Sequence, residues 1–223
     1  MHYPAVIAID GPAGAGKSTL GALLAARLGY LYFDTGVMYR ALTLVALRAG
    51  LDLHDRAAVE DLATRVVIEV APPTQDDGRP YTVLADGDDV SWPIRSPEVE
   101  RHVSLVAGYP GVRRELVRQQ QVIGQRGRVV MVGRDIGTVV MPGADLKIFL
   151  QASLDERARR RANEVRDLPD PPPVTQVREN LARRDDLDHH VMHAASDAVV
   201  FSTDDLSPEE EVAWIMAYLA RQG

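Results

Sequence analysis

The sequence contains no cysteine, so it can form neither a disulfide bond nor a thiolate nucleophile. Its six histidines are scattered along the chain, and none shows the H-E-x-x-H spacing of a zinc site on a helix. Cysteine chemistry is therefore excluded, and zinc chemistry has no support in the sequence.

Lysine is nearly absent too, because Lys17 and Lys147 are its only two occurrences. The formal net charge is -7, which argues against binding a nucleic-acid polymer by neutralising phosphates over a broad basic face. Any bound anion must instead be held locally by arginines. Because the chain otherwise uses arginine, a lysine at a motif position indicates a functional role.

Long apolar runs are also missing, since no stretch is long enough to span a bilayer. The first residues lead into a strand-like segment without a basic, cleavable leader. We therefore expect a cytoplasmic protein with no membrane partner, and a monomer as the default state. Its 223 residues suffice for one compact α/β domain with small appendages.

Short apolar runs alternate with helical patterns along the chain. Residues 5–9 enter a glycine-rich turn and a helical pattern that stops at Gly29, and residues 30–33 precede a helical pattern over 36–49. Further patterns of buried strands cover 129–132, 146–150 and 198–201. Five such strands interleaved with helices predict a doubly wound parallel sheet flanked by helices.

Two segments depart from this alternation. Residues 66–70 and 81–85 alternate like strands around a Pro-, Asp- and Gly-rich turn, which predicts a small β insertion. Residues 167–174 carry four prolines and predict a stiff connector between two helices. The starts of three helices are marked by Ser96 before Pro97 and by capping boxes at Ser153 and Ser207.

The segment 11–18 reads GPAGAGKS and fits G-x-x-x-x-G-K-[ST] in full, between a predicted strand and a predicted helix. In this pattern backbone N–H groups converge on the β-phosphate, the lysine reaches the β and γ oxygens, and the following hydroxyl ligates Mg²⁺. Lys17 is thus a candidate catalytic residue, and Ser18 is the candidate ligand of the metal. We expect ATP to be bound by Gly11, Pro12, Ala13, Gly14, Ala15, Gly16, Lys17, Ser18 and Thr19.

A structural interpretation of this loop is weaker. A glycine-rich turn that merely joins a strand to a helix would not require Lys17 in a chain that otherwise avoids lysine. A guanine-binding switch protein is disfavoured because the sequence has no N-K-x-D tetrapeptide. The sequence therefore indicates a phosphate-binding loop in an enzyme that uses ATP.

Beyond the loop, the chain resembles the bacterial cytidylate kinases from Ile7 to about Leu219. The matching motifs, in the order of that family, are IDGP at 9–12, DTGVMYR at 34–40, DGDDV at 86–90, IRSPEV at 94–99, Ser104, PGVR at 110–113, GRDIGTVV at 133–140, Arg184, Asp185 and Asp188. The resemblance implies the P-loop nucleoside monophosphate kinase fold. It divides the chain into a core (1–35, 100–152 and 190–223), an NMP-binding region with the β insertion (36–99) and a helical lid (153–189).

The resemblance also implies an activity, the transfer of the γ-phosphoryl group from ATP to CMP or dCMP with Mg²⁺ as cofactor. The acceptor phosphate is already anionic, so no general base is needed, and the rate comes from in-line positioning and charge neutralisation. The β insertion is similar to the one that sets cytidylate kinases apart from adenylate and guanylate kinases. The expected partners are therefore two small molecules, ATP and CMP or dCMP.

The acceptor site can be assigned residue by residue from the resemblance. Arg40 and Arg134 would grip the acceptor phosphate with their planar forks. Asp135 and Ser104 would accept from cytosine and Arg113 would donate to it, so that O4 of uracil would meet the Asp135 carboxylate. The substrate-binding set is completed by Thr35, Tyr39, Arg184 and Asp188.

Taken alone, these side chains also have structural interpretations. Arg40 could be a solvated helix residue, Arg134 a partner of Asp135 in a salt bridge, and Ser104 and Arg113 ordinary helix residues. The resemblance favours the functional interpretation for each of them.

The lid carries the remaining candidates for catalysis, Arg157 and Arg161, which are four residues apart and share a helix face. Arg159 and Arg160 lie beside them, and closure of the lid would exclude water from the transfer. After Asp188 the chain departs from many family members, which continue with a further arginine and a Pro-Leu pair where this sequence reads HHVMH.

Two other functions stay open at this point. One is a kinase of the same fold with UMP, another monophosphate or a sugar acid as acceptor. The other is a non-catalytic module that binds nucleotide. The sequence also does not choose between Asp34 and Asp135 as support for a Mg²⁺-bound water.

Overall fold

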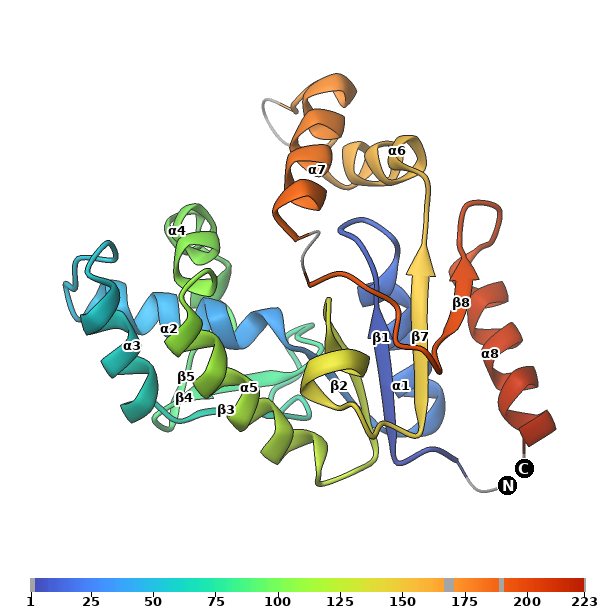
Figure 1. Ribbon diagram of the computed structural model, residues 1–223, viewed down its shortest axis with the longest axis horizontal. Coiled ribbons are helices and arrows are strands. Elements are labelled where there is room, and N and C mark those ends of the chain that lie inside the picture. The colour runs from blue at the N-terminus through green and yellow to red at the C-terminus, as the bar shows by residue number, and fades with distance from the viewer. Residues whose placement is uncertain (1–2, 167–170, 189–190, 223) are drawn as a thin grey trace. The chain divides into compact units, whose positions relative to one another are not determined.

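The structure is a computed structural model that describes residues 3–166, 171–188 and 191–222. The chain forms two compact units (Figure 1). The first comprises Met1–Tyr30 and Val130–Gly223, and the second comprises Leu31–Val129. Each is described by itself below.

The main sheet has five strands in the order β2-β6-β1-β7-β8. They are β1 (Val6–Asp10), β2 (Leu31–Asp34), β6 (Val129–Val132), β7 (Leu146–Gln151) and β8 (Val199–Ser202). In the first unit, β7 pairs in parallel with β1 and with β8. All residues of β1 and β6 are buried, as expected for parallel strands covered on both faces. The predicted parallel sheet is confirmed, and the predicted boundaries of these five strands lie within one residue of the observed ones.

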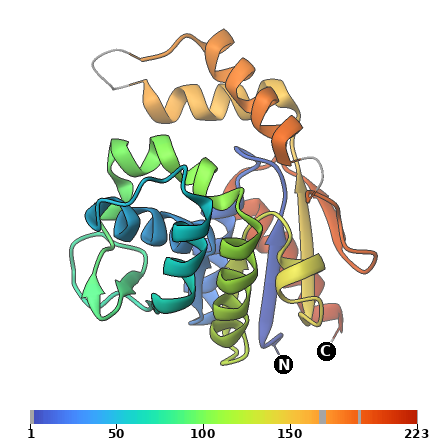
Figure 2. The same cartoon turned by 60° about the vertical axis from the view of Figure 1, so that its left-hand side comes forward.

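The first unit adds four helices to its strands, α1 (Lys17–Leu28), α6 (Leu154–Val165), α7 (Val174–Asp188) and α8 (Pro208–Gln222). A single π-helical turn, η2 (Ile136–Val140), follows β6. The helices α6 and α7 pack side by side, as both ribbon views show (Figures 1 and 2). Between them lies a small apolar cluster of Ala158, Val177 and Leu181, against which Ala13, Leu154 and Ala162 pack.

Two helix starts in this unit test the predicted capping boxes. At Ser207 the box is complete, because the N–H of Ser207 donates to Glu210 at 2.8 Å and the N–H of Glu210 donates to the Ser207 hydroxyl at 3.3 Å. At Ser153 only half of the box forms. The hydroxyl accepts from the N–H of Glu156, whereas the Glu156 carboxylate is engaged by two arginines of its own helix.

The second unit contains the helices α2 (Gly36–Arg48), α3 (Arg56–Arg65), α4 (Pro97–Ala107) and α5 (Pro110–Gly124), and a short 3-10 helix, η1 (Pro93–Arg95). Ser96 caps α4 as predicted, by accepting from the N–H of Val99. The predicted β insertion is present as an antiparallel sheet of β3 (Ile68–Ala71), β4 (Thr82–Ala85) and the short β5 (Asp88–Asp89). Its first strand begins later than predicted, because Val66 caps the end of α3.

A buried arginine holds the turn of this insertion. The Arg79 guanidinium, whose side chain is 5% exposed, pairs with Asp77 and Asp89 and donates to the Ser91 hydroxyl at 3.2 Å. The hydrogen bond from Arg79 lowers the pKa of Asp77, and hydrogen bonds from the Ser91 hydroxyl and from Arg79 lower the pKa of Asp89 to about 2. The polar cluster thus ties the turn to the short strand β5.

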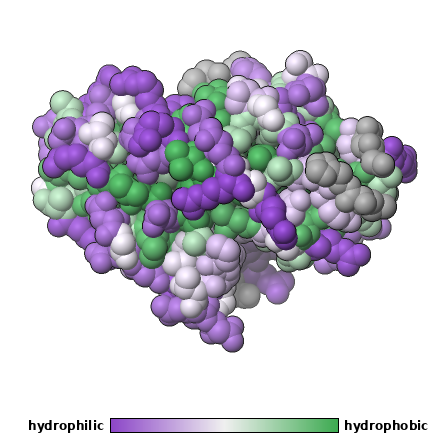
Figure 3. Space-filling model, turned by 90° about the horizontal axis from the view of Figure 1, so that it is seen from below, coloured by the Kyte–Doolittle hydropathy of each residue, from purple (hydrophilic) through white to green (hydrophobic). Residues whose placement is uncertain are grey.

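Each unit has its own buried side chains. Ile7, Ile9, Leu20, Met131 and Leu150 are fully buried in the first unit, and Phe33, Met38, Leu42, Ile94 and Leu116 in the second. On the face seen in Figure 3, hydrophobic residues are interspersed with hydrophilic ones. Within the described parts of the chain, no helix combines the length and the apolar character needed to cross a bilayer.

Candidate active site

The loop 11–18 joins β1 to α1, as the sequence predicts. Gly16 precedes the helix with φ 91°, a left-handed conformation in which its N–H and those of the first turn can point at one anion. Lys17 is the first residue of α1, and its ammonium donates to the carbonyl of Pro12 at 2.7 Å. Ser18 and Thr19 are exposed on the first turn. The loop therefore presents a lysine, two hydroxyls and a helix N-terminus together.

Arg157 of α6 is bound directly to this loop. Its side chain is 6% exposed and donates to the carbonyls of Ala13, at 3.1 Å, and Ala152, at 3.2 Å. It also forms a two-pronged ion pair with Asp185 of α7, at 3.0 and 2.6 Å. The approach is close, since a Cβ added to Gly14 would lie 3.1 Å from Cβ of Arg157. Arg157 thus connects the loop with both helices of the predicted lid.

The neighbouring arginines of α6 differ in their surroundings. Arg161 pairs with Glu164 at 2.6 Å, and its side chain is 55% exposed, so it is not among the contacts of the loop. Arg160 instead donates to the hydroxyl and carbonyl of Thr203, and this hydroxyl donates to the carbonyl of Ala15 at 3.2 Å. The sequence did not single out Arg160, because Thr203 lies 43 residues away.

A pocket of about 560 Å³ opens beside the loop in the first unit. It lies at the carboxyl ends of β7 and β8, where parallel sheets usually bind ligands. Its lining combines the loop, both strands and the helices α6 and α7, and consists of Pro12, Phe149, Gln151, Ala152, Ser153, Arg157, Asp185, Met192, Ser202 and Asp204.

Arg134 and Asp135 follow β6 in the same unit. Nε of Arg134 lies 2.6 Å from Oδ2 of Asp188 on α7. Both atoms are buried, but their angles do not meet those of a hydrogen bond, so the contact is an ion pair without alignment. Asp135 is buried. The structure thus brings two predicted substrate-binding residues, Arg134 and Asp188, into contact.

The rest of α7 carries one further predicted residue. Arg184 is exposed near the end of the helix. The segment after Asp188, where the sequence departs from the family pattern, falls partly outside the described residues, because 189 and 190 are not among them.

The other predicted acceptor residues belong to the second unit. Thr35 is buried directly before α2, and Tyr39 and Arg40 are half-buried on that helix. Arg40 pairs with Glu100 of α4, the helix that also carries the exposed Ser104. Arg113 is half-buried in the first turn of α5.

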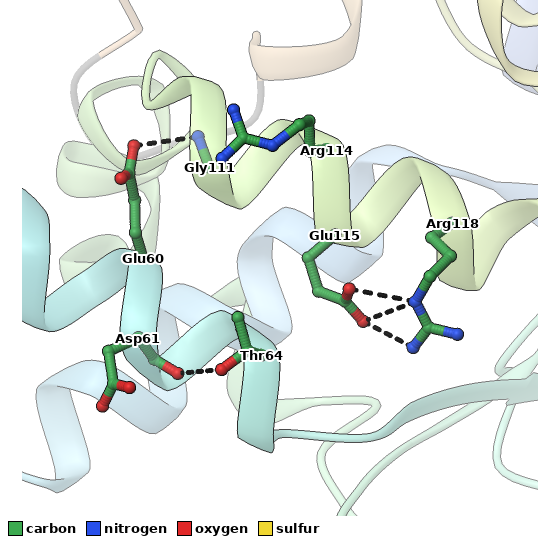
Figure 4. A pocket seen from close by; sticks show the side chains of 7 residues that line it. All are labelled: Glu60, Asp61, Thr64, Gly111, Arg114, Glu115 and Arg118. Atoms are coloured by element: carbon green, nitrogen blue, oxygen red, sulfur yellow. Dashed lines mark hydrogen bonds and ion pairs between the residues drawn. The ribbon is translucent and has the colours of Figure 1, made fainter.

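A second pocket, of about 540 Å³, lies between α3 and α5 (Figure 4). Glu60 accepts here from the N–H of Gly111 at 2.8 Å, and this bond lowers the pKa of the Glu60 carboxyl. Arg118 donates to Glu115 across one turn of α5. The lining holds no predicted site residue, and Glu60 caps the start of the helix that carries Arg113.

The described part of the chain holds no group of three or more histidine or acidic side chains placed to bind a metal. The exposed hydroxyl of Ser18 fits a different type of site. Mg²⁺ keeps several waters and is often held by one or two protein ligands together with phosphate oxygens of the substrate. The chain's own donors therefore fit a magnesium ion that arrives with a nucleotide.

Comparison with known proteins completes this description. The family model described as cytidylate kinase matches residues 7–221. The cytidylate kinase of Chloroflexus aggregans is 65% identical, covering 97% of this chain and 94% of that protein. The cytidylate kinase of Roseiflexus castenholzii is 54% identical, covering 99% of this chain and 95% of that protein. Among solved structures, a shikimate kinase from Bacteroides thetaiotaomicron superposes with a TM-score of 0.52 at 15% identity, covering 98% of this chain and 99% of that chain, which shows a common fold.

Proposed function

Because the chain belongs to the cytidylate kinase family, we propose that its loop 11–18 holds ATP while the γ-phosphoryl group passes to CMP or dCMP. The products are ADP and CDP or dCDP. The observation that carries the proposal is the loop itself, which joins β1 to α1 with Lys17 at the helix start and Arg157 hydrogen-bonded to its backbone.

ATP is assigned to the loop residues Gly11 to Ser18 together with Thr19. The pocket beside the loop supports this assignment, since Pro12 and Arg157 both line it. Mg²⁺ would be held by the Ser18 hydroxyl and would neutralise charge on the phosphates. Lys17 contributes a fixed positive charge at the helix N-terminus.

Arg157 and Arg161 are the proposed lid residues for catalysis. Arg157 is supported by its hydrogen bond to the loop backbone, which brings its cation beside the residues assigned to ATP. Arg161 is exposed and paired within its own helix, so its role requires that a phosphate displace Glu164.

The acceptor is assigned to Thr35, Tyr39, Arg40, Ser104, Arg113, Arg134, Asp135, Arg184 and Asp188. Arg40 and Arg134 each already pair with a carboxylate, which supports anion binding by both. An acceptor phosphate would exchange for these carboxylates, and Asp188 would then be free to meet a ribose hydroxyl. Asp135, which is buried, would discriminate the amine of cytosine from O4 of uracil.

No proton needs to be removed in the transfer, because the attacking oxygen of the acceptor is already anionic. The protein's contribution is alignment of the two substrates, charge neutralisation by Lys17 and Arg157, and exclusion of water by the lid. The division into a core, an NMP-binding region (36–99) and a lid (153–189), the monomeric state and the cytoplasmic location belong to this proposal.

The experiment is a coupled assay of ADP release with ATP and Mg²⁺ against CMP, dCMP, UMP, AMP and GMP, with Lys17→Ala as the blank. Turnover with CMP and dCMP that the blank abolishes is the expected result. Preference for UMP or another acceptor would replace the acceptor assignment. No turnover with any monophosphate would favour a non-catalytic nucleotide-binding module.

A further inference from the structure

Asp10 is a buried carboxylate to which the proposed mechanism gives no role. It ends β1, directly before the phosphate-binding loop, and is 4% exposed. Its Oδ1 accepts from the N–H of Ile136 and its Oδ2 from the N–H of Gly137, each at 2.7 Å. Burial raises the pKa of the Asp10 carboxyl, whereas these two donors and the charge of Lys17 oppose the rise.

The two donors begin η2, immediately after Arg134 and Asp135. A helix leaves its first N–H groups without partners inside the helix, and buried ones must find an acceptor elsewhere. The π-helical winding is visible in the bonds from Val140 to Asp135 at 3.2 Å and from Met141 to Ile136 at 2.6 Å. Asp10 supplies both missing acceptors at once.

The end of β1 is hydrogen-bonded to the backbone immediately before and immediately after Arg134 and Asp135. Before the segment, the N–H of Gly133 donates to the carbonyl of Ile9 at 3.0 Å. After it, Asp10 takes the two N–H groups of η2. The backbone of Arg134 and Asp135 is therefore fixed at two points that are adjacent in β1.

Gly137 permits this close approach. A Cβ added there would lie 3.3 Å from Oδ2 of Asp10 and 3.2 Å from Cδ of Lys147, so the space is already filled. The ammonium of Lys147 is directed to Asp197, at 2.8 and 2.9 Å, and its alkyl chain packs on Gly137. Lys147 therefore packs at the place where η2 meets the end of β1, which we call the β1–η2 junction.

We infer that Asp10 is a positioning residue for the acceptor nucleotide, acting through the backbone of Arg134 and Asp135. The inference rests on the acceptor site proposed above. It separates Asp10 from its neighbours in sequence, because its side chain bonds to η2, whereas residues 11–18 are assigned to ATP. Loss of its carboxylate should loosen the recognition of CMP more than that of ATP.

The principal variant is Asp10→Asn, which keeps the volume but turns an NH₂ group toward one of the two N–H donors. We expect the KM for CMP to rise roughly tenfold, as for the loss of a buried hydrogen bond to a charged group. The preference for CMP over UMP should fall, and the KM for ATP should stay at its wild-type value. Gly137→Ala disturbs the β1–η2 junction from the side of η2. It should likewise raise the KM for CMP and lower the preference for CMP over UMP.

Asp145→Asn is the matched control. Oδ2 of Asp145 accepts from the N–H of Val6 at 2.9 Å, so it performs the same chemistry at the opposite end of β1, on an exposed residue. This variant should keep wild-type values for both substrates. A shift equal to that of Asp10→Asn would mean that any weakening of β1 suffices, which would overturn the inference.

The inference is also overturned if Asp10→Asn and Gly137→Ala keep the wild-type KM for CMP and the wild-type preference over UMP, or if the KM for ATP rises as much as that for CMP. Should Asp10→Asn fail to fold, Gly137→Ala decides alone. Asp135→Asn serves as the reference for the acceptor site. If it too leaves the preference for CMP unchanged, the proposed base recognition has failed; if only Asp135→Asn acts, the positioning role alone is refuted.

Discussion

The contact of Arg157 with the phosphate-binding loop and α7 should contribute measurably to the stability of the first unit. Arg157→Ala removes two bonds to carbonyls and the ion pair with Asp185, whose side chain is 30% exposed. Breaking a buried ion pair costs about 3–5 kcal/mol. Because Asp185 can be rehydrated in part, we expect a loss of about 2–3 kcal/mol in the free energy of unfolding.

A double-mutant cycle isolates the ion pair from the other contacts. We expect Arg157→Ala and Asp185→Ala together to destabilise less than the sum of the two single changes, with a coupling of about 1–2 kcal/mol. Urea unfolding followed by the fluorescence of Trp214, in a Trp92→Phe background, reports on the first unit. Trp214 is suitable because it packs on Phe201 and Tyr218 of that unit.

Arg161→Ala provides the comparison within the same helix. Its pair with Glu164 has side chains that are 55% and 57% exposed, so its removal should change the free energy of unfolding by less than about 0.5 kcal/mol. Coupling of less than about 0.5 kcal/mol between Arg157 and Asp185 would refute the reasoning, because the two residues would then act independently.

Three further predictions concern catalysis and pH. Lys17→Ala should lower kcat by roughly 10³-fold without altering the circular dichroism spectrum, as for the loss of a donor to the transition state; an unchanged rate of ADP release would remove Lys17 from the mechanism. Arg40→Ala, which also breaks the pair with Glu100, should raise the KM for CMP while that for ATP stays constant, as steady-state assays that vary each nucleotide in turn can verify. Burial raises the pKa of Glu211 to about 7 from an ordinary 4.5, so the folded chain holds this proton more tightly than the unfolded chain. The associated stability is present below pH 4.5 and lost as the pH rises through 7; Glu211→Gln should flatten this part of the urea-midpoint profile, and an unaltered slope would contradict the assignment.

The strands and helices of the core could be predicted because short stretches of sequence determine where they begin and end. The buried strands read as short apolar runs, and Gly29 ends α1 in a left-handed conformation as a glycine stop should. The prediction of a capping box at Ser153 was wrong in one of its two hydrogen bonds. The N–H of Ser153 competes with two arginines for the Glu156 carboxylate. This carboxylate binds Arg159 and Arg160, and this lowers its pKa to about 2. Pattern reasoning cannot rank such competitors.

The candidate site could be predicted only where motifs carry it. The loop 11–18 and the positions of Arg40 and Arg134 came from short motifs, and their roles remain proposals. The bonds from η2 to Asp10 join residues more than a hundred positions apart, at 126 and 127 residues, and no local periodicity signals a π-helical turn. The contact of Arg160 with Thr203 was likewise beyond the sequence, because it depends on where β8 ends.

The small cluster between α6 and α7 has a consequence for how the proposed lid would respond to temperature. Ala158, Val177 and Leu181 form one cluster of buried residues on the two helices, and among the described side chains packed on it only Ala13 belongs to the loop. A lid that opens as a unit would therefore uncover little apolar surface, and the heat-capacity change of opening scales with that surface. The balance between open and closed lid should consequently shift only gently with temperature, even where the stability of the whole protein changes steeply.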